Sequence, residues 1–199
     1  MTSKTIRSFD GPAGTVAAKV MARMNRGAEV AAVETLAPGP HDTVLAIGFG
    51  PGVGVELLAA RLVGGRVVGV DPSGVMMREA TRRNARFIDH GKVQLHRAGV
   101  QAIPVSDASC DGAIAVNSAQ LWQPFADGVA EVARVLRPGA RLVTLTHDWA
   151  LEKQAGRVDA WLESARETLE RHGFTEIEHW RAHVERGRSI TLCARLSRR

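Results

Sequence analysis

The sequence predicts an α/β protein with a doubly wound, mostly parallel sheet of seven strands. Short apolar runs alternate with segments of helical periodicity between Thr43 and Thr146, a pattern typical of repeated β/α units. A glycine-rich turn joins the first apolar run to a helix. Two more strand-like runs, 174–184 and 189–196, are so close in sequence that they must form an antiparallel hairpin. We therefore expect one reversed strand, in a C-terminal hairpin at the edge of the sheet.

Length and composition fit one domain with a sizeable core. The chain has 199 residues, of which 45% are hydrophobic and 24% charged. No apolar run approaches the roughly 20 residues of a membrane helix, and the N-terminus lacks the apolar core of a signal peptide. Cys110 and Cys193 lie in apolar runs and are expected to be buried thiols that form no metal site. We expect a cytoplasmic protein without membrane insertion.

The net charge of +5 raises the question of a nucleic-acid partner. The basic residues are scattered along the chain, and the densest group, from Arg78 to Arg86, fits the solvated face of one helix. Nucleic acid is therefore an unlikely partner, and a small molecule is favoured. The sequence leaves open whether the protein is a monomer or a homodimer.

The first 40 residues are expected to form an N-terminal helical cap on a domain that spans residues 41–199. Helical periodicity runs from Thr15 to Leu36, with an interruption at 25–27, so two helices are predicted. The breakers of 37–40 end this segment.

The β/α units follow in order. Strands are expected at Thr43–Ile47, Arg66–Val70, Lys92–His96, Asp111–Val116 and Arg141–Thr146, and helices at Val55–Leu62, 73–90, Phe125–Leu136 and Val158–His172. The fourth strand is apolar, as central parallel strands are. Ser73 can cap the second helix, and Arg137-Pro138-Gly139 ends the third.

The glycine turn and an acid mark a ligand site. Gly48, Gly50, Gly52 and Gly54 follow the first strand, and Asp71 follows the second. Ligands of open parallel sheets sit beyond these strand ends, where backbone N–H groups hold anions and a carboxylate can accept both ribose hydroxyls. The alternative is an Asp-Pro-Ser turn that only caps the next helix. A nicotinamide dinucleotide is less favoured because Val53 stands where its third fingerprint glycine belongs.

Five motifs in order resemble the class I S-adenosylmethionine-dependent methyltransferases, most closely the small-molecule branch of the ubiquinone and menaquinone methyltransferases. They are Val44–Gly52, Val68–Ser73 with Met76, Ala98–Pro104, Cys110–Ser118 and Arg134–Ala140. The resemblance implies a Rossmann-like fold and methyl transfer from S-adenosyl-L-methionine to a small molecule, with S-adenosyl-L-homocysteine as product. It implies cofactor contacts at Gly48, Phe49, Gly50, Gly52, Asp71, Pro72, Met76, Gly99, Val100, Gln101, Asn117 and Ser118.

Two positions depart from the family pattern. At the position of Ala46 the family usually has an acid that helps to organise the methionine end of the cofactor. At the position of Gly99 it usually has a second acid, which contacts the adenine. Backbone groups and water can do the same work. The alternatives are a catalytically weak or inactive cofactor-binding protein, or an RNA-modifying methyltransferase that uses the basic surface.

Candidate catalytic residues follow the fifth strand. His147 is the candidate general base, with Asp148 beside it; the alternative is an exposed loop pair. Trp122, Trp149 and Asn25 are candidate substrate contacts. The segment after the fourth strand reads Asn117-Ser118-Ala119-Gln120 and lacks the Asn-Pro-Pro-aromatic signature of enzymes that methylate base amino groups.

Overall fold

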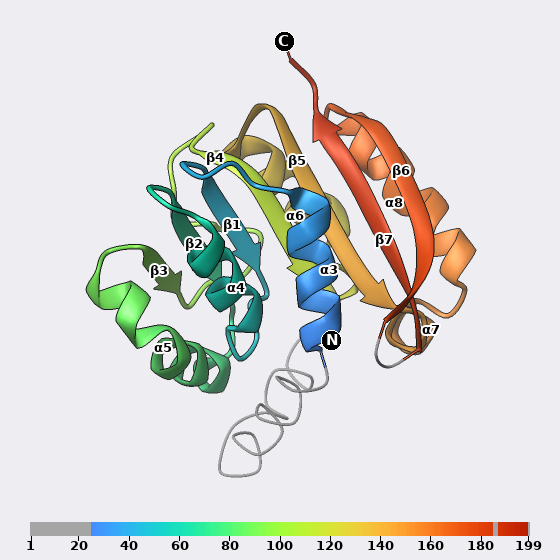
Figure 1. The fold of residues 1–199 in the computed structure, drawn as a ribbon. Helices are drawn as coiled ribbons and strands as arrows, with labels where there is room; N and C mark the ends of the chain where they lie inside the picture. The colour runs from blue at the N-terminus through green and yellow to red at the C-terminus, as the bar shows by residue number, and fades with distance from the viewer. Residues whose placement is uncertain (1–24, 185–186, 199) are drawn as a thin grey trace.

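The computed structural model describes residues 25–184 and 187–198. Seven strands form one sheet in the order β3-β2-β1-β4-β5-β7-β6 (Figure 1). Their bounds are β1 Thr43–Ile47, β2 Arg66–Val70, β3 Val93–His96, β4 Cys110–Val116, β5 Leu136–His147, β6 Phe174–Val184 and β7 Gly187–Leu196. The predicted doubly wound, mostly parallel sheet is confirmed. The reversed strand is β7, antiparallel to both β5 and β6, so it lies one place in from the edge, and β6 takes the edge.

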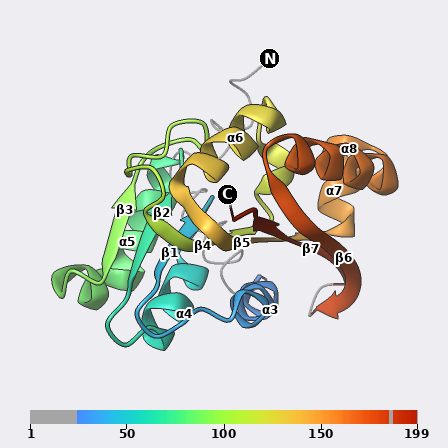
Figure 2. The ribbon, with the colours of Figure 1, turned by 90° about the horizontal axis from the view of Figure 1, so that it is seen from above.

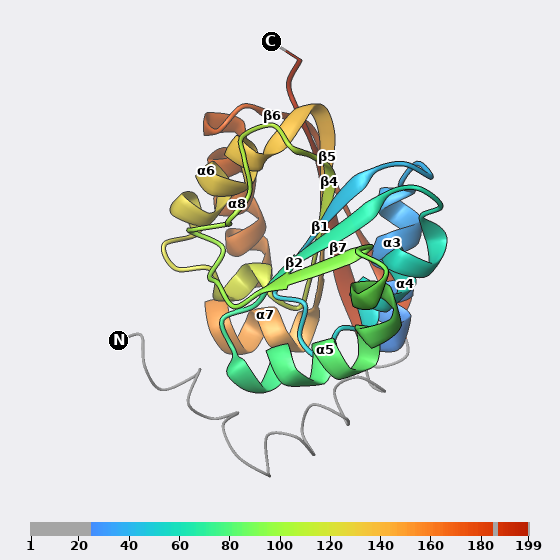
Figure 3. The same ribbon diagram turned by 90° about the vertical axis from the view of Figure 1, so that its left-hand side faces the viewer.

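The helices cover both faces of this sheet. Their bounds are α3 Arg26–Leu36, α4 Val53–Arg61, α5 Gly74–Asp89, α6 Phe125–Val135, α7 Asp148–Ala155 and α8 Val158–Arg171, with a 3₁₀ turn, η1, at Ala119–Leu121. Helices α3, α4 and α5 lie on one face, and α6, α7 and α8 lie on the other (Figures 2 and 3). Two apolar cores follow from this arrangement, one on each side of the sheet. Leu58 of α4 and Leu169 of α8 are examples of buried helix residues, each contributing about 1.5–3 kcal/mol through burial.

The parallel register brings the ends of the central strands to one edge. Strand β1 pairs in parallel with β2 and β4, and β4 pairs in parallel with β5. The segments that follow these strands, which start at Gly48, Asp71, Asn117 and Asp148, therefore meet at the carboxyl edge. The site described below is built there.

The segment from α6 to α7 differs from the predicted one. Strand β5 begins at Leu136 rather than Arg141, because Leu136 already pairs with Cys110 before the register shifts. Gly139, with φ of 86°, lies in the irregular stretch between the two registers. The helix α7 and the turn η1 were not predicted, since each is too short for helical periodicity to be recognised.

Helix α3 is the described part of the predicted N-terminal cap. It begins at Arg26, next to the predicted interruption, and Asn25 precedes it. Ala32, Val33 and Leu36 are buried in a core shared with β1 and α4. The other predicted helix of this segment lies outside the described residues.

The sequence predicts buried thiols and no membrane-spanning segment. Cys110 is buried as expected, whereas Cys193 is only half-buried; both are free thiols, and burial raises the pKa of each. Among the described residues, no helix combines the length and apolar character needed to cross a bilayer.

Candidate functional site

The glycine turn between β1 and α4 has a backbone that only glycine adopts easily. Gly48, Gly50 and Gly52 all have positive φ, at 64°, 52° and 81°. A Cβ at Gly48 would stand 2.5 Å from the Cβ of Ser118, whereas nothing lies within 4 Å of one at Gly50. The turn is therefore tight against the protein at Gly48 and open at Gly50. The predicted cofactor residue Phe49 differs, because its ring is buried against Gly69 and only its backbone belongs to the turn.

Asp71 ties the end of β2 to this turn. Its Oδ2 accepts a hydrogen bond from the N–H of Gly50 at 2.9 Å, and its Oδ1 accepts one from the N–H of Ser73 at 2.8 Å. Burial raises the pKa of this carboxyl, and the two N–H groups oppose the rise. A carboxylate has about four acceptor sites, so each oxygen keeps a lone pair for a ligand. The predicted partnership of the turn and the strand-end acid is therefore present in the fold.

The start of α5 holds two further predicted residues. Pro72 follows Asp71, and Ser73 caps the helix by accepting a hydrogen bond from the N–H of Met76 at 3.4 Å. The cap that the sequence predicted is confirmed. Met76 is buried under the first turn of α5, beside the end of β2.

The loop after β3 carries Gly99, Val100 and Gln101. Val100 is buried, and the Nε2 of Gln101 donates to the carbonyl of Gln123 at 3.1 Å. A Cβ at Gly99 would meet only the Oε1 of Gln101, at 3.1 Å. The loop therefore lies against the segment that leads from η1 to α6.

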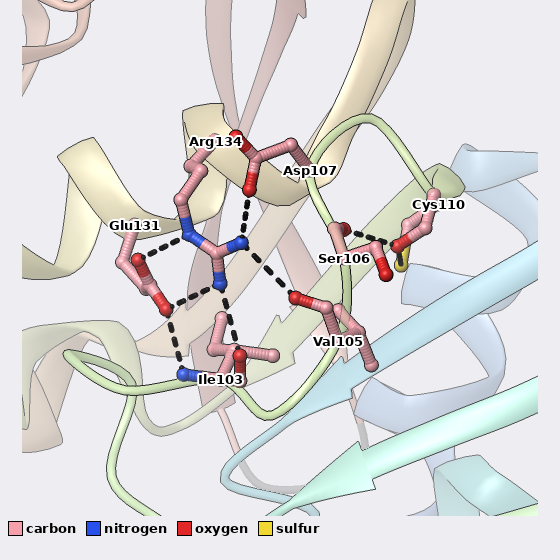
Figure 4. A network of polar contacts seen from close by, with 8 residues as sticks. Ile103, Val105, Ser106, Asp107, Cys110, Glu131 and Arg134 are labelled. Atoms are coloured by element: carbon pink, nitrogen blue, oxygen red, sulfur yellow. Dashed lines mark hydrogen bonds and ion pairs between the residues drawn. The ribbon is translucent and has the colours of Figure 1, made fainter.

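A network centred on Arg134 fixes the rest of this loop (Figure 4). The guanidinium of Arg134 donates to the carbonyls of Ile103 and Val105, at 3.0 Å each, and pairs with Glu131 and Asp107. Glu131 in turn accepts the N–H of Ile103 at 2.8 Å. Because Arg134 lowers the pKa of Glu131, this carboxylate stays ionised at neutral pH. Helix α6 thus anchors the loop that follows Gly99–Gln101.

The end of β4 is joined to both neighbouring strands. Ser118 donates from Oγ to the carbonyl of Ile47 at 2.8 Å. Asn117 has a left-handed φ of 50°, and its Oδ1 accepts the backbone N–H of His147 at 3.0 Å. Its buried Nδ2 has no hydrogen-bond partner among the described residues. An orphaned buried donor of this kind fits a site completed by a ligand.

His147, the candidate base, is buried rather than exposed. It is the last residue of β5 and only 1% of its surface is accessible, so the alternative of an exposed loop position is wrong for it. Its Nδ1 lies 3.0 Å from Oδ1 of Asn117. Since a backbone N–H also donates to this oxygen, the oxygen is an acceptor and Nδ1 carries the proton. Asn117 thereby sets the tautomer of His147.

The other predicted residues are spread around this edge. Oδ2 of Asp148 pairs with Arg188 of β7 at 3.3 Å, and Trp149 is half exposed, with its ring 5.9 Å from that of His147. Trp122 is buried and stacks on Phe125 at 5.8 Å, so it is part of the core. Asn25 stands at the start of α3.

Sequence reasoning missed Glu29. This residue lies in the first turn of α3 and lines a small cavity with Ala46, Gly48, Phe49 and Gly54. Burial raises the pKa of its carboxyl from the ordinary 4.5 to about 8. Helical periodicity gave no signal for it, because an acid in a first helical turn is usually a solvated residue that favours the helix dipole.

A second hollow lies away from the glycine turn. It is formed by Thr175, Glu176 and residues 195–198, where β6 begins and β7 ends. This is the end of the sheet away from the carboxyl ends of the parallel strands and the glycine turn. Within the described ranges, no group of three or more His, Cys, Asp or Glu side chains could hold a metal ion.

Comparisons with known proteins agree with this geometry. A family model described as "Methyltransferase domain" matches residues 45–144, half of the chain. The chain is 32% identical over 108 residues to the O-methyltransferase cnsE of Penicillium expansum, covering 54% of this chain and 39% of that protein. It is 30% identical over 122 residues to the ubiquinone/menaquinone biosynthesis C-methyltransferase UbiE of Syntrophotalea carbinolica, covering 61% of this chain and 51% of that protein. The chain thus spans about half or less of these two curated relatives.

A solved structure matches over nearly the whole length. It is the putative methyltransferase in a complex with the Haloferax volcanii Trm112 methyltransferase activator, with a TM-score of 0.77 and 17% identity over 98% of this chain and 99% of that one. At this identity the likeness concerns the fold alone. The match of the family model, which runs from β1 into β5 and includes the glycine turn, Asp71 and Asn117, shows that the chain belongs to the methyltransferase domain family, of the class I S-adenosylmethionine-dependent type.

Proposed function

We propose that this chain binds S-adenosyl-L-methionine and transfers its methyl group to a small-molecule acceptor. The observation that carries the proposal is the hydrogen bond between Asp71 and Gly50, at 2.9 Å. It holds a carboxylate with spare acceptor sites beside a glycine turn whose central residue faces open space. Both features lie at the carboxyl edge of a parallel sheet, where α/β folds bind nucleosides.

The residues present fit such a cofactor. Asp71 would accept the ribose hydroxyls, and the backbone of Gly48–Gly52 would lie against the amino-acid portion. The loop at Gly99–Gln101 would border the adenine, held in place by the Arg134 network. The orphaned Nδ2 of Asn117 supports the proposal, since a ligand group at the end of β4 would satisfy it.

The cofactor, when bound, supplies a methyl group on a positively charged sulfur, which is already activated for displacement. The chain's task is then to position the acceptor and, where the acceptor keeps its proton at neutral pH, to remove it. His147 is suited to the second task because Asn117 keeps the proton on Nδ1, which makes Nε2 the basic nitrogen. Asp148 as its companion and Asn25, Trp122 and Trp149 as substrate contacts stay predictions.

The acceptor is proposed to be a small molecule methylated at oxygen or carbon. The named relatives, an O-methyltransferase and a C-methyltransferase of quinone biosynthesis, support this class. A cap formed by residues 1–40 would cover the acceptor, and a cytoplasmic location is proposed because Cys110 and Cys193 are free thiols.

Titration calorimetry tests cofactor binding directly. We expect S-adenosylmethionine and S-adenosylhomocysteine to bind the full chain, and Asp71→Ala to weaken both. Asp89→Ala is the control, because Asp89 is an exposed residue at the far end of α5. If neither ligand binds at millimolar concentration, the proposal is wrong.

Two further measurements separate the alternatives. Methyl transfer from labelled cofactor to small oxygen or carbon acceptors supports the enzyme, whereas cofactor binding without transfer to any acceptor favours an inactive cofactor-binding protein. RNA binding that weakens with salt would favour the RNA-modifying alternative.

A further inference from the structure

Glu29 occupies an unusual place for an acid. Helix α3 begins at the carboxyl edge of the sheet and runs back along its face (Figure 1). Its first turn brings Glu29 into the cavity beside the glycine turn. The carboxyl lies so close to α4 that a Cβ at Gly54 would overlap its Oε2. The small residues Ala46 and Gly54 thus leave the room that this carboxyl fills.

No group in the described part of the chain neutralises or hydrogen-bonds this carboxyl. No hydrogen bond or ion pair joins it to another described residue, and burial alone accounts for its pKa of about 8. The residues that α4, β1 and β4 contribute to the cavity are apolar or glycine. The acid in the first turn of α4, Glu56, is paired with Arg83 at 3.4 Å. A carboxyl held in this way is costly to ionise until a cation or donor reaches it.

We propose that Glu29 binds the ammonium group of the amino-acid portion of the cofactor, as a positioning residue for methyl transfer. The inference rests on the proposed function. Asp71 and Glu29 lie by different parts of the same glycine turn, Asp71 bonded to Gly50 and Glu29 beside Gly48 and Gly54. A nucleoside held at Asp71 therefore extends its amino-acid portion along the turn toward Glu29. The ammonium group at the end of that portion is a cation with N–H donors, so it can both neutralise and hydrogen-bond a carboxylate in this cavity.

The assignment also accounts for Ala46. The family resemblance leads us to expect an acid at this position, and the structure places Ala46 and Glu29 in the same cavity. A carboxyl group reaches this cavity from α3 instead of β1. Two ionised acids in this cavity would repel each other. A carboxyl group at position 29 is therefore compatible with a small, uncharged residue at position 46 and not with a second acid.

The test compares two ligands that differ in the ammonium-bearing part. S-adenosylhomocysteine carries it, and 5′-methylthioadenosine, a related thioether nucleoside, does not. For Glu29→Gln we expect S-adenosylhomocysteine to bind about 10- to 100-fold more weakly, the effect of losing a charged hydrogen bond, while 5′-methylthioadenosine binds as it does to the wild type. Glu34→Gln is the matched control, since Glu34 is an exposed acid of the same helix and should change neither affinity.

Proton release gives a second readout that does not depend on activity. A carboxyl with a pKa of about 8 is mostly protonated at neutral pH and must lose its proton to pair with an ammonium group. Calorimetry in buffers of different ionisation enthalpy should detect this release with S-adenosylhomocysteine for the wild type and not for Glu29→Gln. The double variant Glu29→Gln/Ala46→Asp should recover part of the affinity, because it returns a carboxylate to the same cavity.

The outcomes distinguish this inference from the proposed function. If the wild type binds neither nucleoside, both fail. If the wild type binds S-adenosylhomocysteine and Glu29→Gln binds it equally well, only the role of Glu29 is overturned. Equal weakening of both ligands would also overturn it, since a general distortion of the site does not discriminate between them. Should Glu29→Gln fail to fold, the wild type decides, because it should release a proton on binding S-adenosylhomocysteine and none on binding 5′-methylthioadenosine, which lacks the ammonium group.

Discussion

Asp71 accepts the backbone N–H of Gly50 at 2.9 Å and so joins the end of β2 to the glycine turn at the end of β1. The two residues lie 21 positions apart in sequence, and the bond fixes the turn from outside its own segment. The same carboxylate accepts the N–H of Ser73 and thereby shapes the start of α5. One side chain thus holds both backbone segments that border the proposed nucleoside site.

Asp71→Asn should destabilise the protein and weaken cofactor binding. An amide replaces one acceptor oxygen by an NH₂ group, which then faces the N–H of Gly50 or of Ser73. Losing one of these buried bonds should lower the free energy of unfolding by about 1–3 kcal/mol, measured by urea denaturation. Asp89→Asn, an exposed change in α5, should leave both quantities unchanged. Equal stability of Asp71→Asn and the wild type would show that these bonds do not hold the turn.

Gly48→Ala should be much more harmful than Gly91→Ala. Both glycines have left-handed φ, 64° and 69°, so both substitutions cost about 1–2 kcal/mol in backbone strain. Only at Gly48 does the new Cβ also meet Ser118, at 2.5 Å, because nothing lies within 4 Å at Gly91. Denaturant unfolding of the two variants isolates the clash. Equal losses would mean that Ser118 moves away freely.

Arg134→Ala should loosen the loop after β3 without unfolding the sheet. The guanidinium holds the carbonyls of Ile103 and Val105 and orients Glu131 toward the N–H of Ile103. We expect faster hydrogen exchange at this N–H, measured by NMR. Arg82→Ala is the matched control, since Arg82 also pairs with a glutamate three residues away, but its side chain is 65% exposed. Unchanged exchange in Arg134→Ala would show that Glu131 alone holds the loop.

The stability of the wild type should fall with rising pH because of Glu29. The carboxyl has a folded-state pKa of about 8 and an ordinary value of 4.5, so the folded state binds the proton more tightly than the unfolded state. Its stabilising contribution is complete below about pH 4.5 and is lost as the pH rises to about 8, with a slope of at most about 1.4 kcal/mol per pH unit. Thermal unfolding of the wild type and Glu29→Gln across this range measures the difference. Parallel pH profiles would contradict the prediction.

His147→Ala should lower turnover more than it lowers cofactor affinity. The imidazole is placed at the end of β5 by its backbone and ring contacts with Asn117, and it is proposed to act on the acceptor rather than on the cofactor. Once an acceptor is identified, kcat and the calorimetric Kd of S-adenosylhomocysteine can be compared, with thermal unfolding as a check on this buried position. Unchanged turnover would remove His147 from the mechanism.

Much of the fold, and the contact between the glycine turn and Asp71, followed from the sequence. Apolar runs, helical periodicity and breakers are local signals, and they predicted the succession of strands and helices along the chain, the Ser73 cap and the hairpin. The pairing of the glycine turn with Asp71 also followed, because parallel strands bring residues at their carboxyl ends to one edge. Strand β5, in contrast, was predicted five residues too short at its start, since its pairing with Cys110 is a contact between distant segments.

Only the tertiary structure decided which side chains turn into the site. It placed Trp122 in the core and His147 in a buried position beside Asn117. It also brought Glu29 from α3 to the cavity at Ala46 and Gly54. Periodicity identifies a helix and its apolar face, but the depth and rotation at which that helix packs depend on the small residues it meets on other elements. The sequence alone therefore determined where the backbone of the site lies, while packing between distant segments determined that its unpaired carboxyl comes from α3.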